Sequence, residues 1–349
     1  MRSLPLRLSF VLLLIVAARS FAWDAAGHRL IAQLAVEGMG QGAPDFLKDP
    51  NNITQIADQA TLPDRWRSTH LVQLTHVNEP DHYLDVEDLD AFGLTLETLP
   101  PLRYEYIKAM VLAKEKAGDK FTGRPVDEAH DAAKTREWPG FVPYAIVENY
   151  GRLQSAFATI RELEQINDPA RADQLEMAKE NAKAIMGVMA HYVGDASQPL
   201  HTTMHHHGWV GDNPNGYTTD HGFHSFIDGG VIRLHHIDAA MVRPLCKFDG
   251  KVNAQEPWKD VIAYLDTTYH QVEPLYQLEK SGELKKDKGR EFICERLAAG
   301  ASMLGTMYKA AWDSAAPKSK DVQEFERYDN FEKPAPSAQP AAAPAGAAK

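Results

Sequence analysis

Residues 184–201 read AIMGVMAHYVGDASQPLH. Before Asp195, the only polar side chains in this stretch are His191 and the Tyr192 hydroxyl, and the apolar residues recur at helical spacing, which predicts a buried helix. Because Asp195 follows His191 by four residues, both side chains fall on one face of that helix. The same face carries residues small enough to admit a close neighbour: Ala184, Gly187 and Val188. The stretch therefore predicts a helical core that contains a histidine–aspartate pair.

A carboxylate in such a core is costly to bury unless it is paired or bound to a metal ion. One interpretation is a structural hydrogen bond between His191 and Asp195. However, His224 and Asp228 repeat the same spacing after a loop, and a proline ends the first helix so that His201 can turn back. Imidazole nitrogens and carboxylate oxygens are ordinary zinc ligands, so this set favours a site for more than one ion.

The rest of the chain also has helical periodicity, and no stretch shows the two-residue alternation of a strand. Further helices are expected over residues 25–39, 101–118, 142–166, 172–198 and 288–312, with long loops over 117–140 and 202–222. The sequence predicts an all-α fold with a single helical domain over residues 23–330. Residues 331–349 are mostly proline and alanine, and we expect a disordered tail there.

The first 22 residues have the layout of a secretory signal peptide, with Arg2 and Arg7 before a short apolar run and small residues before Trp23. A retained membrane anchor is the alternative, although the run is short for a membrane span. We expect cleavage between Ala22 and Trp23, a secreted or periplasmic protein, and no stable membrane association. In an exported chain, Cys246 and Cys294 are compatible with one disulfide.

The overall charge is acidic, with 37 lysines and arginines against 48 aspartates and glutamates and a net charge of −11. Loss of residues 1–22 would remove three arginines and take the charge to −14. Such a surface repels polyanions at long range, which argues against non-specific binding of nucleic acid through a basic patch. Any phosphate chemistry must rely on local charge within a site.

Two upstream stretches offer further ligands. The stretch LPDRWR places Asp64 beside arginines, and the stretch DHYLD contains His82. Each signal is weak by itself, because Pro-Asp often starts a helix and a single histidine usually packs. Asp58 and His76 compete for the same roles.

The expected mature N-terminus completes the pattern. The α-amine of Trp23 would titrate near ~8, so it can lose its proton to a metal ion at modest cost. Its amine nitrogen and carbonyl oxygen would chelate one ion, with His28 nearby. The alternative is that Trp23 only packs and His28 lines the helix. The tract His205–His207 is either a solvated loop or a place of adventitious metal binding.

Together these residues resemble the trinuclear-zinc superfamily of secreted single-strand-specific nucleases from fungi and plants and of bacterial phospholipases C. The order of motifs matches: an N-terminal Trp with Gly-His soon after, an Asp ahead of an Arg, and then the two His-x3-Asp pairs with His201 between them. The Gly-His opening and the GDxxQPLH motif are closer to the nucleases. The resemblance implies a phospholipase C/nuclease-type helical bundle.

The resemblance also implies three zinc ions and their ligands. Asp64, His82, His191 and Asp195 would hold the first ion, His201, His224 and Asp228 the second, and the Trp23 amine and carbonyl, His28 and a bridging Asp195 the third.

The implied activity is phosphodiester hydrolysis. Asp64 would orient or deprotonate the attacking water, Arg67 would stabilise charge on the phosphorus oxygens, and Tyr83 with Asp85 would form a nucleobase platform. We therefore expect a zinc-dependent endonuclease that cleaves RNA and single-stranded DNA to 5′-phosphate products, with a nucleic acid or nucleotide substrate and no protein partner. The alternatives are a phospholipase C that acts on phospholipid head groups and a metal-binding helical protein without turnover.

Overall fold

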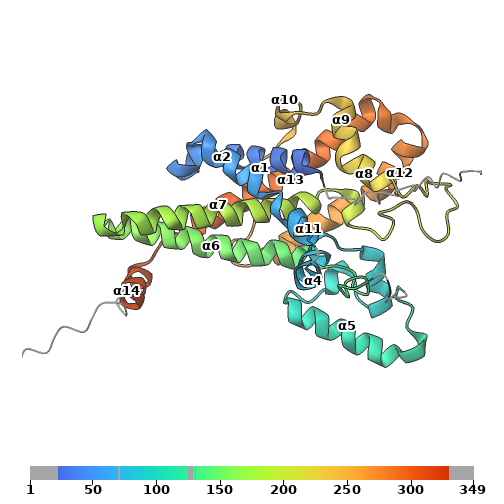
Figure 1. Ribbon diagram of the computed structural model, residues 1–349, viewed down its shortest axis with the longest axis horizontal. Helices are drawn as coiled ribbons and strands as arrows, with labels where there is room; N and C mark the ends of the chain where they lie inside the picture. The colour runs from blue at the N-terminus through green and yellow to red at the C-terminus, as the bar shows by residue number, and fades with distance from the viewer. Residues whose placement is uncertain (1–22, 70, 125–128, 130, 330–349) are drawn as a thin grey trace, which may run out of the picture.

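Two long helices, α6 (Val142–Ile166) and α7 (Ala172–Asp195), form a hairpin that runs along the molecule (Figure 1). The structure is a computed structural model that describes residues 23–69, 71–124, 129 and 131–329. The signal peptide predicted over residues 1–22 and the tail predicted over residues 331–349 lie outside the described residues.

Helices account for nearly all the regular structure of the described residues, where the only β-type pairing is a single antiparallel bridge between Leu84 and Gly140. This confirms the all-α prediction. The other α-helices are α1 (Ala25–Gly38), α2 (Pro50–Gln59), α3 (Leu62–Arg67), α4 (Val72–Asn78), α5 (Arg103–Ala117), α8 (Phe223–Ser225), α9 (Val231–His235), α10 (Ala239–Val242), α11 (Trp258–Tyr269), α12 (Val272–Lys280), α13 (Asp287–Ser314) and α14 (Ser319–Asp329).

The helix predicted to reach residue 198 ends earlier. Helix α7 stops at Asp195, and the chain turns through the short 3₁₀ segment η8 (Pro199–His201). Gln198 caps this segment by accepting a hydrogen bond from the Leu200 N–H at 2.6 Å. The proline thus acts in the first turn of the next segment, where its missing N–H costs nothing.

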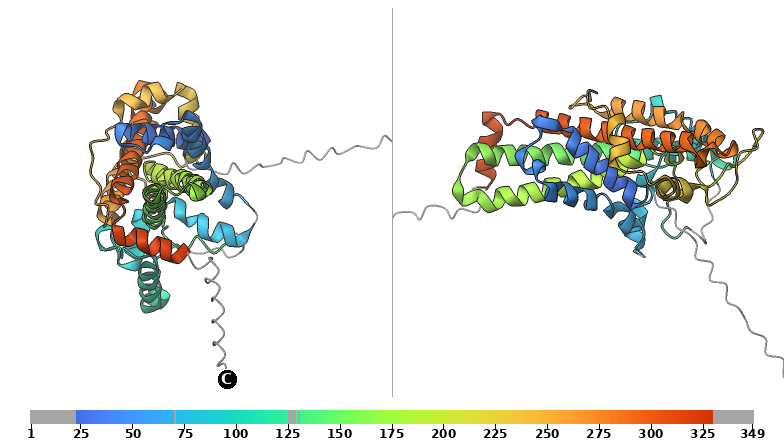
Figure 2. Two further views of the ribbon diagram at one scale, coloured as in Figure 1. Left: turned by 90° about the vertical axis from the view of Figure 1, so that its left-hand side faces the viewer. Right: turned by 90° about the horizontal axis from the view of Figure 1, so that it is seen from above.

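Around the α6–α7 hairpin, α1 and α13 pack against each other and against α7, and α2 covers α7 beside α1 (Figure 2). The core residues of α1 are apolar side chains on one stripe, as an amphipathic helix requires. They include Ile31, Leu34 and Ala35. Asp24 begins α1 by accepting a hydrogen bond from the Ala26 N–H at 3.1 Å. In this way α1 brings its own first turn against the end of α7.

The face of α7 that carries Gly187 is only partly covered. Ala184 and Val188 are half-buried rather than enclosed, and they line a cleft of about 500 Å³ together with Trp66. At Gly187 itself α2 comes so close that a Cβ would lie 2.2 Å from the Cβ of Gln59. The predicted close approach therefore occurs at the glycine, and its neighbours open onto the cleft.

The fold also bears on the two cysteines and on the search for a helix that could cross a membrane. Cys246 and Cys294 are both free thiols, so the disulfide considered for them is not formed. Within the described ranges no helix combines the length and the apolar character that crossing a membrane requires.

The contact at Gly187 gives a test of the packing. We expect Gly187→Ala to destabilise the protein by about 1–3 kcal/mol, because the new methyl group must push α2 away from α7. The matched control is Gly151→Ala on α6, where an added Cβ meets no atom within 4 Å. Removing that glycine from a helix interior should stabilise by about 0.5–1 kcal/mol. Thermal unfolding of both variants measures the sign of each change in stability. Equal changes in the two variants would contradict this packing.

Candidate metal centre

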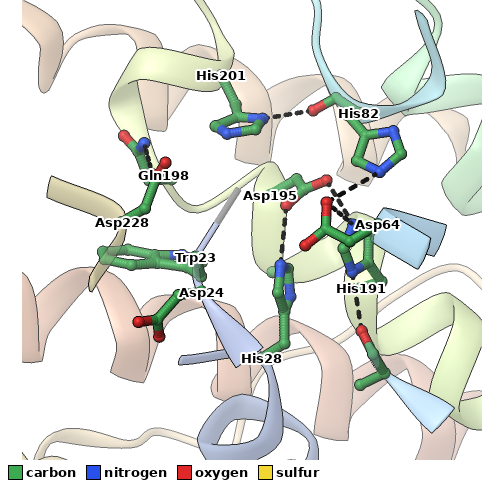
Figure 3. Close-up of polar contacts among 12 residues, drawn as sticks. Trp23, Asp24, His28, Asp64, His82, His191, Asp195, Gln198, His201 and Asp228 are labelled. Carbon is green, nitrogen blue, oxygen red and sulfur yellow. Dashed lines mark hydrogen bonds and ion pairs between the residues drawn. The ribbon is translucent and has the colours of Figure 1, made fainter. Parts of the chain in front are cut away.

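Five buried side chains from four elements converge at the C-terminal end of α7 (Figure 3). Helix α7 supplies a histidine and an aspartate one turn apart, while α1, α3 and the 3₁₀ segment η3 (Pro80–His82) supply one ligand-type residue each. The five are His28, Asp64, His82, His191 and Asp195. The structure thus brings together residues that lie up to 167 positions apart in the chain.

The carboxylate of Asp195 lies between two imidazoles. Its Oδ1 is 3.3 Å from His28 Nε2, and its Oδ2 is 3.3 Å from His191 Nε2. On the other side of His191, the Oδ1 of Asp64 is 3.9 Å from His191 Nε2 and 3.7 Å from His82 Nε2. The carboxylates and imidazoles therefore alternate around one small volume.

A second group lies beside the first. His201 comes from η8, and the two other members come from α8 and the π-helical turn η9 (Phe226–Gly230). His224 Nε2 is 3.0 Å from His201 Nε2 and 3.5 Å from Asp228 Oδ2. The described residues thus contain three sets of ligand atoms that can hold metal ions: His28 with Asp64 and His191, His82 with His191 and Asp195, and His201 with His224 and Asp228.

Three of these histidines are oriented by backbone carbonyls. Nδ1 of His82 bonds to the Asn78 carbonyl at 2.5 Å, and Nδ1 of His191 bonds to the Ala60 carbonyl at 2.8 Å. Nδ1 of His201 bonds to the carbonyl of His82 at 2.7 Å. Because a carbonyl only accepts, each Nδ1 carries the proton, and each Nε2 keeps its lone pair for the site.

Polar atoms at the centre have no hydrogen bond within the described part of the chain. Buried polar atoms normally find a partner, and leaving one unsatisfied costs about 1–3 kcal/mol. This concentration at one point is the property expected of ligand atoms. The unsatisfied atoms are both ring nitrogens of His28, Oδ1 of Asp64, Nε2 of His82, Nε2 of His191, both oxygens of Asp195 and Nδ1 of His224.

Burial controls the protonation of the centre. It lowers the pKa of His28, His82 and His224 well below the ordinary histidine value, so these rings are neutral, which is the form that binds metals. Burial also raises the pKa of Asp195 to about 6. For His191, burial acts in the opposite direction but is outweighed by the neighbouring carboxylates, which raise its pKa.

Trp23 lies at the same end of α1. Its ring is fully buried, and its Nε1–H donates to Ser197 Oγ at 2.9 Å. The next residue, Asp24, donates its backbone N–H to the carbonyl of Asp228 at 3.1 Å and holds Arg233 at 2.6 Å. These contacts tie the predicted N-terminal residue to the aspartate of the second group.

The competing candidates lie elsewhere. Asp58 has a side chain that is 61 % exposed and pairs with Arg29, and His76 is on the surface with its Nδ1 against the Ala133 carbonyl. Neither belongs to a ligand set of the described residues. Asp64 instead points inward, where its Oδ1 also forms an ion pair with Arg67 at 2.9 Å.

The predicted nucleobase platform consists of two residues, one of which, Asp85, is engaged by other side chains. Tyr83 is half-buried, and Asp85 is fully buried. Oδ2 of Asp85 pairs with Arg124 at 2.7 Å, and its Oδ1 lies 3.6 Å from His206 Nδ1. A role in base binding stays a prediction.

Sequence reasoning missed two supporting residues. Gln198 donates from Nε2 to Asp228 Oδ1 at 2.7 Å, which leaves Oδ2 facing His224. Ser197 fixes the Trp23 indole and donates to the Gly194 carbonyl at 2.7 Å. Both lie in the stretch between Asp195 and His201, but the side chains that they hold, Trp23 and Asp228, come from distant parts of the chain.

Comparison with known proteins gives no relative: no family model, no curated protein and no solved structure matches this chain. The properties of the centre therefore carry the functional argument.

The shared carboxylate should control metal content. We expect Asp195→Asn to lose most of the metal that the purified protein retains after dialysis, because the amide removes the charge and one ligand oxygen between His28 and His191. The control is Asp58→Asn, at an exposed carboxylate outside the ligand sets. Elemental analysis measures the metal content of both variants. Equal metal content in the folded Asp195→Asn protein would refute the ligand role.

Proposed function

We propose that this chain is a zinc-dependent phosphodiesterase that cleaves single-stranded DNA and RNA and leaves 5′-phosphate ends. The observation that carries the proposal is the convergence of unsatisfied imidazole nitrogens and carboxylate oxygens at the end of α7. The order of these residues in the sequence resembles that of the trinuclear-zinc nucleases and phospholipases.

The spacing of the ligand atoms supports zinc. Zinc ligands lie at about 2.0–2.2 Å in a tetrahedron, so neighbouring ligand atoms are about 3.3 Å apart. The contacts within the centre run from 3.0 to 3.9 Å. Mixed imidazole and carboxylate donors suit zinc better than magnesium or calcium, which prefer oxygen ligands.

The proposed ligand assignment differs slightly from the three geometric sets. We assign Asp64, His82, His191 and Asp195 to one ion and His201, His224 and Asp228 to a second. Trp23, His28 and Asp195 would hold a third, so that Asp195 would serve as a ligand in two of the sites. The geometric set of His28, Asp64 and His191 combines ligands that we assign to the first and third ions, because the ligand atoms of these two ions lie close together.

Bound zinc would lower the pKa of a water molecule and offset charge that develops on a phosphate. The chain's own residues have complementary roles. The Asp64 carboxylate would orient the attacking water and accept its proton. Arg67, on the next turn of α3, would donate charge-assisted hydrogen bonds to the phosphorus oxygens as the water attacks and the P–O3′ bond breaks.

The role of Arg67 has a matched control on its own helix. We expect Arg67→Ala to lower kcat on single-stranded DNA by about 10²–10³-fold, the effect of removing one donor to a developing oxyanion. Arg65→Ala removes a neighbouring arginine that is exposed to solvent and should leave kcat unchanged. Cleavage of DNA and RNA must also stop when a chelator is added. If the pure protein cleaves neither substrate, the proposal is wrong.

A phospholipase C is the second candidate because a cleft with both apolar and charged side chains in its walls adjoins the centre. Its walls include Trp66, Val77 and Ile185, and its lining residue Asn78 holds His82 through a backbone carbonyl. A phosphatidylcholine emulsion assayed beside the nucleic acids separates the two functions. Chelator-sensitive release of a phosphorylated head group without nuclease activity would favour the lipase.

The N-terminus provides an independent prediction. We propose export and cleavage before Trp23, which would free its amine as a ligand. One additional glycine before Trp23 would convert that amine into a peptide nitrogen, and we expect the zinc content to fall from three ions to two per chain. The zinc content of the extended and mature proteins is measured by elemental analysis, and their activities are compared in parallel. Full zinc content and full activity in the extended variant would exclude a chelating terminus.

A further inference from the structure

We infer that His207 and His221 form a binding site for a second phosphate group of the substrate, beside the second ligand set. These two residues are called the histidine rim below. The inference rests on the proposed function and extends it, because it explains how an acidic protein would hold a polyanionic strand. It concerns the loop over residues 202–222, between α7 and α8 (Figure 1).

One imidazole of the rim, His207, lies beside the proposed ligand His224, and the second, His221, stacks near His207. The ring centroid of His207 lies 5.3 Å from that of His224 and 6.4 Å from that of His221, and the planes of the two rim rings are 18° from parallel. Both side chains are exposed at the surface, whereas His224 is buried. A strand that reaches the second ligand set would therefore pass the rim.

The loop is fixed well enough to present the rim. Its two arms are joined by a hydrogen bond from the Trp209 N–H to the Thr218 carbonyl at 2.8 Å. Gly208, between His207 and Trp209, has φ +90°, and a Cβ there would lie 2.5 Å from the Thr219 backbone. Only glycine suits both the conformation and the close approach. This crossing brings the residues on either side of it, His207 and His221, opposite each other.

The other two histidines of the loop already have structural partners. His205 stacks on Trp209 with ring centroids 3.9 Å apart and accepts a hydrogen bond from the Val210 N–H at 3.1 Å. His206 bonds to the Thr203 carbonyl at 3.0 Å and faces Asp85. In contrast, the rim nitrogens make no hydrogen bond to the described residues. They remain available to a ligand.

The surrounding charge favours an anion over a further metal ion. Arg136 lies near enough to His207 to act on it electrostatically. Asp85, which also acts on His207, is paired with Arg124 at 2.7 Å. No set of three ligand atoms among the described residues includes a rim histidine. Imidazole N–H groups beside an arginine suit a phosphate oxygen.

The test uses the full mature protein loaded with zinc and the double variant His207→Gln/His221→Gln. We expect its Kd for a single-stranded phosphorothioate oligonucleotide to rise about 10-fold, the effect of losing two hydrogen bonds. Hydrolysis of bis(4-nitrophenyl) phosphate, which has only one phosphate, should stay unchanged, as should zinc content. The control His270→Gln alters an imidazole that is 68 % exposed and outside the ligand sets, and it should change none of these.

Three results for the double variant would contradict the proposed role of the rim. The first is an unchanged Kd for the oligonucleotide, and the second is an equal loss of activity on bis(4-nitrophenyl) phosphate. The third is a loss of zinc, which would make the rim histidines metal ligands. In each case the wild-type protein still cleaves nucleic acid, so the proposed function survives. If the wild-type protein neither binds nor cleaves the oligonucleotide, the proposed function fails, and the rim inference fails with it.

Discussion

The Asp195 carboxylate is enclosed between the imidazoles of His28 and His191, with one oxygen 3.3 Å from each ring. Full burial raises its pKa, and neither oxygen has a hydrogen bond in the described chain to offset the loss of water. A buried carboxylate of this kind is stable only beside positive charge. Metal ions between the three side chains would supply that charge, and the helices that bring α1 against α7 are what keep the three together.

The bundle supports this arrangement with rigid backbone rather than with flexible loops. Backbone carbonyls orient three of the imidazoles, and Gln198 orients Asp228. Sites on helices hold their geometry more precisely than sites on loops, and fixed outer contacts raise the affinity of ligands for a metal. The long loop over residues 202–222 is itself fastened by a stacked histidine–tryptophan pair. The supporting contacts therefore reach from the core to the edge of the site.

Much of this could be predicted from local spacing. The four-residue interval of His191 and Asp195 sets one helix face, and that face does point at the centre. What spacing leaves open is which elements cover a face, since that depends on contacts between distant segments. Hence Ala184 and Val188 line a cleft although their pattern favoured a close neighbour, and Gln198 could not be matched with Asp228. Spacing alone also could not decide whether Asp58 or Asp64 is the ligand, because the fold determines which of the two carboxylates points to His191. The distance between two cysteines is likewise set by the fold and not by their positions in the chain.

We propose that zinc binds on both sides of Asp195. Crystals of the mature protein grown with zinc, with diffraction data collected on both sides of the zinc absorption edge, test this proposal. We expect anomalous peaks about 2 Å from each carboxylate oxygen of Asp195, with His28 near one peak and His191 near the other. A well-ordered structure without an anomalous peak within coordination distance of Asp195 would contradict it.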